Sequence, residues 1–243
     1  MQPVQNPANK RATVRRPLLL DLYCGIGGSA VGYYRAGFDV VGVDIVRQHH
    51  YPYTFVHGDA ISYLRKTNLR QFDLIHASPP CKQHTIARRV ALSRYQSLFD
   101  PHPENMVEAT RELLAASGRP YVIENVPGAP LIEPVRYCGS SFGLQVRRHR
   151  LFETSLPIVA PACDHNSQPH PVGVYGQGGA WTRTQPGGGG TKVAGPDAAR
   201  ALGIDWTTEQ AGLSQAVPPA YTEHIGRQLH TRLFGWVQLD LFG

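Results

Sequence analysis

Short apolar runs alternate with helical stretches between residues 18 and 125, and this alternation restricts the possible folds more than any other feature. The runs are continuous and brief, as parallel strands covered by helices on both faces are. We predict strands at 18–22, 40–43, 53–56, 72–77 and 121–123, and helices at 29–36, 60–66, 106–114 and 219–233. Repeated strand–helix–strand units predict an α/β fold with a doubly wound, mostly parallel, Rossmann-like sheet and a small loop-rich appendage.

Acidic residues and glycines follow the predicted strands at their carboxyl ends, where doubly wound sheets bind ligands. The glycine-rich turn at 24–28 lets the backbone approach a ligand closely, although a purely structural turn fits it equally well. Asp44 lies 23 positions after Asp21 (44 − 21), a spacing that presents an acid to ribose hydroxyls at the second strand end. Together these features favour a nucleoside-type cofactor.

Three further positions carry chemistry, each with a plainer alternative. Cys81 follows two prolines at a predicted strand end, where a thiolate can act as a nucleophile or the cysteine can have no chemical role. Glu124 can protonate a heterocycle or form an ion pair. Arg147, Arg148 and Arg150 can hold an oxygen or a phosphate, or form a solvated surface run. We expect a strand here, around Leu151-Phe152, on which Arg148 and Arg150 share one face.

The composition excludes several classes of protein. No apolar stretch reaches the roughly 20 residues that span a membrane, so no membrane partner is expected. The basic N-terminal segment lacks the apolar core of a signal peptide, and four cysteines without an export signal indicate reduced thiols in a cytoplasm. The 24 basic and 18 acidic residues give a net charge of +6, which is compatible with a phosphate-bearing partner.

The domain organisation follows from changes in composition. We expect a flexible basic tail at 1–16, a catalytic core at 17–156, a short loop-rich insertion at 157–213 and a segment at 214–243 that returns to the core. Residues 160–197 are rich in Pro, Gly, Gln and His, which favours loops over a second core. Trp206 is expected to anchor a loop rather than stack on a base.

A small group of cysteines and histidines suggests a metal site only weakly. Cys163 and His165 form a Cys-x-His sequence, with Cys138 before it and His170 after it. These residue types bind zinc, but the paired Cys-x-x-Cys spacing of many zinc sites is missing. We therefore expect no metal.

Seven motifs, in order from Asp21 to Gly226, resemble those of the cytosine-C5 methyltransferases, which use S-adenosylmethionine. The motifs are DLYCGIGG at 21–28, VGVDI around Asp44, GDA around Asp59, SPPC at 78–81, ENV at 124–126, Arg148-His149-Arg150, and VPPAYTEHIG at 217–226. Some flanking positions depart from the family pattern, including 82–85, Val146 and Ser214-Gln215, but no predicted catalytic residue is lost.

The resemblance implies a methyltransferase sheet, S-adenosylmethionine as the cofactor, and DNA as the partner. The cofactor residues it implies are Asp21, Tyr23, Gly25, Gly27, Gly28, Asp44, Ile45, Asp59, Ala60, Pro80 and Gln215. The catalytic residues it implies are Cys81 as the nucleophile at C6 of cytosine, Glu124 at N3, and Arg148 with Arg150, the latter near O2. A cytosine in duplex DNA would be flipped out of the stack to reach them.

The length of the chain indicates which members of this family it resembles most. Only 61 residues (214 − 152 − 1) separate Phe152 from Ser214, where full-length family members carry a large target-recognition domain. The chain therefore resembles the compact forms encoded by bacteriophages, and a monomer in the host cytoplasm is expected. RNA or a free cytosine nucleotide as substrate, and a nucleic-acid-binding relative without turnover, remain as alternatives.

Overall fold

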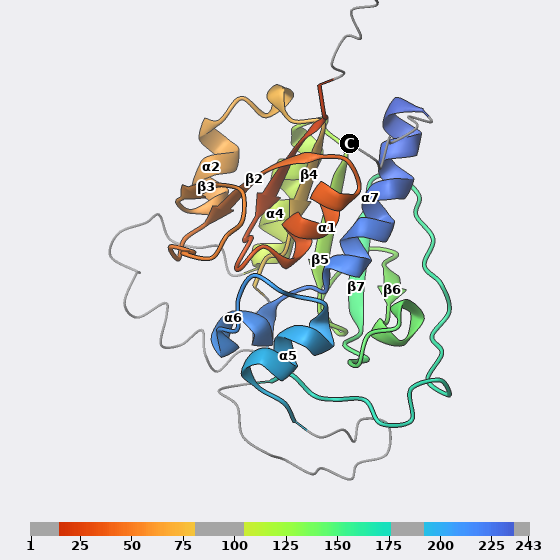
Figure 1. Cartoon of the computed structure of the whole chain (residues 1–243). Helices are drawn as coiled ribbons and strands as arrows, with labels where there is room; N and C mark the ends of the chain where they lie inside the picture. The colour runs from red at the N-terminus through yellow and green to blue at the C-terminus, as the bar shows by residue number, and fades with distance from the viewer. Residues whose placement is uncertain (1–14, 81–104, 176–191, 236–243) are drawn as a thin grey trace, which may run out of the picture.

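A seven-stranded sheet forms the centre of the computed structural model, which describes residues 15–80, 105–175 and 192–235 (Figure 1). Its strand order is β3-β2-β1-β4-β5-β7-β6. The strands are β1 (Leu18–Leu22), β2 (Asp39–Asp44), β3 (Thr54–His57), β4 (Leu74–Ala77), β5 (Tyr121–Asn125), β6 (Val135–Tyr137) and β7 (Arg150–Thr154). The first five pair in parallel, and β7 runs antiparallel to both β5 and β6.

Helices cover both faces of this sheet. The described helices are α1 (Gly28–Arg35), α2 (Ala60–Lys66), α4 (Met106–Ala116), α5 (Gly195–Leu202), α6 (Gln210–Gln215) and α7 (Pro219–Phe234), with short 3-10 turns η1 (Leu69–Gln71) and η2 (Gly139–Phe142). Helices α1 and α7 pack together on one face and α2 and α4 on the other, each pair over its own buried apolar cluster. Among the described helices, none is long and apolar enough to cross a membrane.

The order in which strands are added to the sheet reverses between the neighbouring strands β1 and β4. From β1 the chain proceeds outward to β2 and β3, and then returns to β4 on the other side of β1. Ligands of such sheets bind in the crevice outside the carboxyl ends at this switch point. The doubly wound, mostly parallel sheet predicted from the sequence is thereby confirmed.

Local signals placed the elements of the first half well. Asp59 caps α2 by accepting a hydrogen bond from the Ser62 N–H at 2.8 Å, and the helix covers the predicted range 60–66. The predicted strand at 121–123 is longer in the structure and includes Glu124. The strand expected around Leu151-Phe152 is found as β7. Its partner β6 was not predicted, because a three-residue strand gives too little periodicity to detect.

The segment of Arg147 to Arg150 corrects one expectation. Arg148 precedes β7 and has a left-handed φ of 34°, so it does not share a strand face with Arg150. Its conformation is fixed by long-range contacts of its side chain, described below, which a local pattern does not reveal.

The region predicted as a loop-rich insertion contains more packed structure than expected. Helices α5 and α6 lie beyond the carboxyl ends of the parallel strands (Figure 1) and form a third apolar cluster with Ile26 and Val146. The Trp206 indole N–H donates to the Ile26 carbonyl at 2.8 Å. Trp206 thus anchors a loop, as predicted, and fastens this region to the turn after β1.

Candidate active site

The glycine-rich turn after β1 presents its backbone at the switch point. Gly25 and Gly27 have left-handed φ values of 49° and 90°. A Cβ at Gly25 would meet no atom within 4 Å, whereas one at Gly27 would lie 2.8 Å from Pro52 and one at Gly28 would lie 2.2 Å from the Val217 carbonyl oxygen. Of the three glycines assigned to the cofactor, Gly25 therefore leaves room for a ligand, while Gly27 and Gly28 permit close packing.

Asp44, the last residue of β2, binds the same turn. Its two carboxylate oxygens accept hydrogen bonds from the backbone N–H groups of Gly25 at 2.9 Å and Val46 at 2.8 Å. Burial raises the pKa of this carboxyl group, while these backbone donors act in the opposite direction. Asp44 thus holds the turn after β1 against the end of β2.

Asp21 is a buried acid in β1 with incomplete hydrogen bonding. Its Oδ2 accepts a long bond of 3.5 Å from the Tyr51 hydroxyl, and its Oδ1 has no hydrogen-bond partner. Burial raises the pKa of Asp21 well above its usual value, and the negative charges of Asp44 and Glu124 add to this effect. A buried carboxylate oxygen without a partner is costly, and in a ligand crevice it is a candidate to bind a ligand donor.

The remaining predicted cofactor residues lie around the same edge. The Ile45 carbonyl accepts a bond from His57, Ala60 begins α2 directly after Asp59, and the Tyr23 hydroxyl is 2.9 Å from Thr110 of α4. Gln215 ends α6 and is exposed.

The segment leading to the predicted nucleophile is fixed at its base. Pro79 follows β4, and its carbonyl accepts a hydrogen bond of 2.7 Å from the side-chain amide of Asn125, which is the last residue of β5. The Ser78 N–H donates to the Leu22 carbonyl at 3.1 Å. Pro80 is the last described residue here, and Cys81 lies outside the described residues.

A buried histidine contacts the segment that leads to Cys81. His76 of β4 lies 3.1 Å from the Tyr33 hydroxyl through Nδ1 and 3.1 Å from the Ser78 hydroxyl through Nε2. Complete burial lowers the pKa of His76 to about 3, so the ring is neutral at physiological pH. The sequence did not single out His76, because it occupies an interior position of an otherwise apolar strand.

Glu124 and Arg150 form a buried ion pair across the site. The Arg150 Nε lies 3.0 Å from Glu124 Oε1, and the two side chains are 13% and 8% exposed. Burial raises the pKa of Glu124, opposed by the positive charges of Arg150 and Arg148 and by the Ser78 hydroxyl. A carboxyl group with a raised pKa, held beside an arginine in a buried site, is a candidate to donate a hydrogen bond or a proton to a heterocycle.

Arg148 binds the segment before α7 and thereby holds it near the Glu124–Arg150 ion pair. Its guanidinium donates to three backbone carbonyls, those of Ala216 at 2.8 Å, Val174 at 3.2 Å and Ser214 at 2.7 Å. The Tyr221 hydroxyl in turn donates to the Arg148 carbonyl at 3.0 Å. With three donors occupied in this way, Arg148 has the contacts of a positioning residue.

The structure thus gathers most predicted residues at one edge of the sheet. Asp21, Asp44, Asp59, Glu124 and Arg150 all lie at the carboxyl ends of β1, β2, β3 and β5 or on the adjacent β7. Sequence reasoning did not assign roles to Asn125, His76 and Tyr221. Asn125 and Tyr221 stand inside the ENV and VPPAYTEHIG motifs, so the motifs themselves contained the signal.

Comparison with known proteins identifies structures that have the same fold as this chain. No protein-family model and no curated protein sequence matches the chain. Solved structures do match it. A protein described as a DNA modification methyltransferase encoded within an E. coli prophage is 17% identical, with a TM-score of 0.59 over 88% of this chain and 99% of that one.

Two further structures agree. The Dnmt2 methyltransferase of S. pombe is 14% identical, with a TM-score of 0.54 over 90% of this chain and 100% of that one. The methyltransferase EhMeth of Entamoeba histolytica is 12% identical, with a TM-score of 0.57 over 90% and 99%. At these identities the likeness concerns the fold, and the chain has the Rossmann-like α/β fold of methyltransferases.

Proposed function

We propose that the chain transfers a methyl group from S-adenosylmethionine to C5 of cytosine in DNA, through a covalent bond between Cys81 and C6 of the base. The observation that supports this most is the buried Glu124–Arg150 ion pair beside the fixed base of the segment that leads to Cys81. These residues stand in the motifs that resemble those of the cytosine-C5 methyltransferases. The three structural neighbours, all named as methyltransferases, have the same fold.

The crevice at the switch point fits such a cofactor. S-adenosylmethionine carries a positively charged sulfonium and a ribose with two hydroxyl donors. Asp21 offers a buried oxygen without a partner, Asp44 stands at the end of β2, and Gly25 leaves open space beside the turn. When bound, the cofactor supplies an electrophilic methyl group.

The residues of the chain would make C5 reactive in the following way. The Cys81 thiolate adds to C6, and the electron pair of the C5–C6 double bond moves to C5 to form a C4–C5 double bond, while the C4–N3 pair moves to N3; the resulting enamine makes C5 nucleophilic. Glu124 in its protonated form donates to N3, and Arg150 donates to O2, so the developing charge on the ring is stabilised. After C5 has gained the methyl group, a base takes the C5 proton, the double bond re-forms and the bond from Cys81 to C6 breaks.

DNA is the substrate that the charge and the neighbours favour. A net charge of +6 suits a phosphate backbone. The E. coli prophage neighbour is described as a DNA modification methyltransferase. A duplex cytosine must leave the stack to reach a side chain, so base flipping is part of the proposal.

Trapping with 5-fluorocytosine tests the proposal directly. Fluorine at C5 cannot be removed as a proton is, so the covalent bond to the enzyme persists. Duplex DNA containing 5-fluorocytosine and S-adenosylmethionine should give a complex stable to denaturing electrophoresis with the wild type and none with Cys81→Ala. The unfolding midpoint of Cys81→Ala, measured alongside, excludes misfolding as the cause.

Matched substrates separate the alternatives. The same incubation with 5-fluorocytosine in RNA or in a free nucleotide shows which substrate is trapped fastest. Stronger trapping of RNA or the nucleotide would overturn the assignment to DNA but keep the chemistry. Cofactor binding without trapping or methyl incorporation in any substrate would favour a nucleic-acid-binding protein without turnover.

A further inference from the structure

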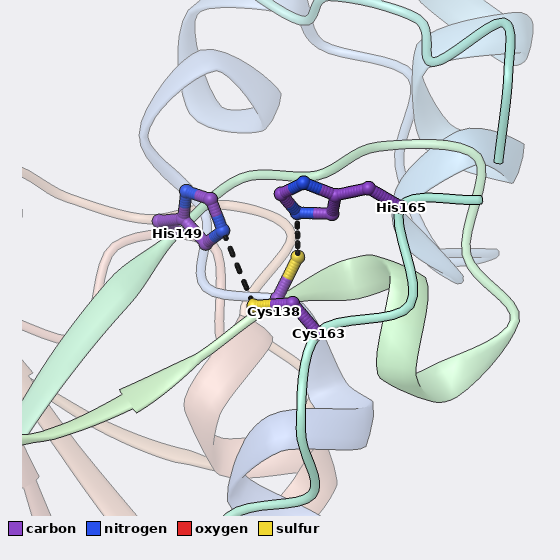
Figure 2. Close-up of side chains that lie close together, drawn as sticks. All are labelled: Cys138, His149, Cys163 and His165. Carbon is purple, nitrogen blue, oxygen red and sulfur yellow. Dashed lines mark hydrogen bonds between the residues drawn. The ribbon is translucent and has the colours of Figure 1, made fainter. Parts of the chain in front are cut away.

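Two cysteines and two histidines come together outside the candidate active site. The ligand atoms of Cys138, His149, Cys163 and His165 all lie within 4.8 Å of one another, as Figure 2 shows. Cys138 follows β6, His149 immediately precedes β7, and the other two lie on the loop after β7. Residues from three places along the chain therefore converge on one point.

The distances match those of a tetrahedral zinc site. The Cys138 Sγ lies 3.4 Å from His165 Nε2, and the Cys163 Sγ lies 3.6 Å from His149 Nε2. Zinc–sulfur and zinc–nitrogen bonds of about 2.3 and 2.0–2.1 Å place tetrahedral S and N ligands about 3.6 Å apart. These two pairs are thus already spaced as ligands of one ion, and all four atoms lie within 4.8 Å of one another.

The donor set also selects the metal. Two thiolates and two imidazoles in a tetrahedral arrangement are typical of Zn²⁺, whereas Mg²⁺ and Ca²⁺ prefer oxygen ligands. Cys138 and Cys163 would each lose a proton, so two thiolates would balance the charge of the ion. Four protein ligands leave no open position, which is the arrangement of a structural rather than a catalytic zinc.

Neighbouring groups hold the ligands in place. The Ser140 hydroxyl accepts a hydrogen bond from the Asp164 N–H at 3.1 Å. Its own proton is then available for the Cys138 sulfur, which lies 3.1 Å away. A hydrogen bond of this kind stabilises a thiolate. Through Ser140 it also connects Asp164, which lies between Cys163 and His165, to Cys138.

We propose that the chain binds one structural Zn²⁺ through Cys138, His149, Cys163 and His165. The sequence grouped Cys138, Cys163 and His165 with His170 and led us to expect no metal, whereas the structure places His149 beside the first three. His170 is exposed and stands outside the cluster found among the described residues. His149 lies 14 residues before Cys163 and inside a motif assigned to the active site, so spacing alone did not suggest it.

The position of His149 indicates which part of the chain a bound zinc would stabilise. His149 stands between Arg148, which holds the carbonyls of Ser214 and Ala216, and Arg150, which pairs with Glu124. The left-handed φ of Arg148 is unfavourable for a residue with a side chain, and such a conformation persists only where its surroundings hold it. A zinc bond to the next residue fixes this backbone and attaches the loop after β7 to it.

Metal analysis of the full, untagged chain tests the proposal. Protein purified without chelators should contain about one zinc per chain by mass spectrometry of metals. Cys163→Ser and His165→Gln should each lose most of it, whereas His170→Gln, an exposed histidine on the same loop, should keep it. Cobalt(II) in place of zinc should give the intense visible absorption and thiolate charge-transfer band of a tetrahedral thiolate site.

Stability provides a readout that does not depend on activity. Chelation of the metal should lower the unfolding midpoint of the wild type and leave that of Cys163→Ser unchanged, because a structural zinc binds only the folded chain. If the ligand variants fail to fold, the metal content and cobalt spectrum of the wild type decide. A wild type that holds no zinc after reconstitution, that binds a different metal instead, or that forms a Cys138–Cys163 disulfide in its place overturns the proposal.

Discussion

The Nε of Arg150 lies 3.0 Å from Oε1 of Glu124 across the antiparallel pair of β7 and β5, and both side chains are largely buried. A second buried ion pair, at 2.7 Å, joins Arg111 of α4 to Glu153 of β7. The two pairs offer a matched comparison, because under the proposed function only the first contacts the base. Their contrast gives the first prediction.

Glu124→Gln should lower kcat/KM for methyl transfer by about 100-fold or more, because an amide cannot carry the proton that a general acid gives to the base. Glu153→Gln should instead lower the free energy of unfolding by about 3 kcal/mol, since Arg111 loses its buried partner. Its kcat/KM per folded molecule should stay near that of the wild type. Labelled methyl incorporation and urea unfolding of both variants give the two numbers. Wild-type kcat/KM in Glu124→Gln would remove Glu124 from the chemistry.

Asp21→Asn should stabilise the protein most at high pH. The pKa of Asp21 is raised in the folded state, so the contribution of this group to stability is full below the unfolded pKa of about 3.9 and is lost as the pH rises through the folded value. Asparagine removes the buried charge and still accepts from Tyr51. The difference in unfolding midpoint between variant and wild type should grow as the pH rises above the unfolded pKa of about 3.9, while affinity for S-adenosylmethionine falls. A difference that does not change with pH would contradict this account.

His76 should make the protein sensitive to acid. Its pKa is about 3 in the folded state against about 6.5 unfolded, so its stabilisation is present above pH 6.5 and is lost as the pH falls toward 3. The loss can reach about 1.4 kcal/mol per pH unit. His76→Gln keeps a donor and an acceptor for Tyr33 and Ser78 but does not titrate, so its unfolding free energy should fall less steeply below pH 6.5. His170→Gln serves as the control and should follow the wild type; equal slopes in all three proteins would show that His76 is not the group responsible.

Gly32→Ala should separate α1 from α7. A Cβ at this position would lie 2.0 Å from the Thr222 hydroxyl oxygen and 2.2 Å from the Pro219 carbonyl oxygen, and the second is backbone that cannot turn away. We expect a loss of about 3 kcal/mol, at the upper end of overpacking in a core. Gly58→Ala is the matched control, because a Cβ there would meet no atom within 4 Å, and it should change stability by less than about 1 kcal/mol. Denaturant unfolding compares them, and equal losses would disprove the close approach of the two helices.

The parts of the fold encoded in short segments were predicted correctly. The cap at Asp59, the helix after it, and the strands ending near Asp44 and Glu124 each depend on a few neighbouring residues. The doubly wound, mostly parallel sheet was predicted because repeated strand–helix–strand units permit few sheets, whereas the order of its strands came from the structure. The acids at the strand ends could therefore be placed on one edge without coordinates.

Tertiary structure decided the rest. Arg148 leaves the expected strand geometry because its guanidinium binds carbonyls from Val174, Ser214 and Ala216, which no local pattern places beside it. The grouping of His149 with Cys138, Cys163 and His165 likewise depends on how the hairpin and the following loop fold back. The sequence by itself determined the class of sheet, the succession of its strands and helices along the chain and which side chains stand at the strand ends, because these follow from local periodicity. Which loop residues meet was set by contacts between distant segments, and only the folded chain contains that information.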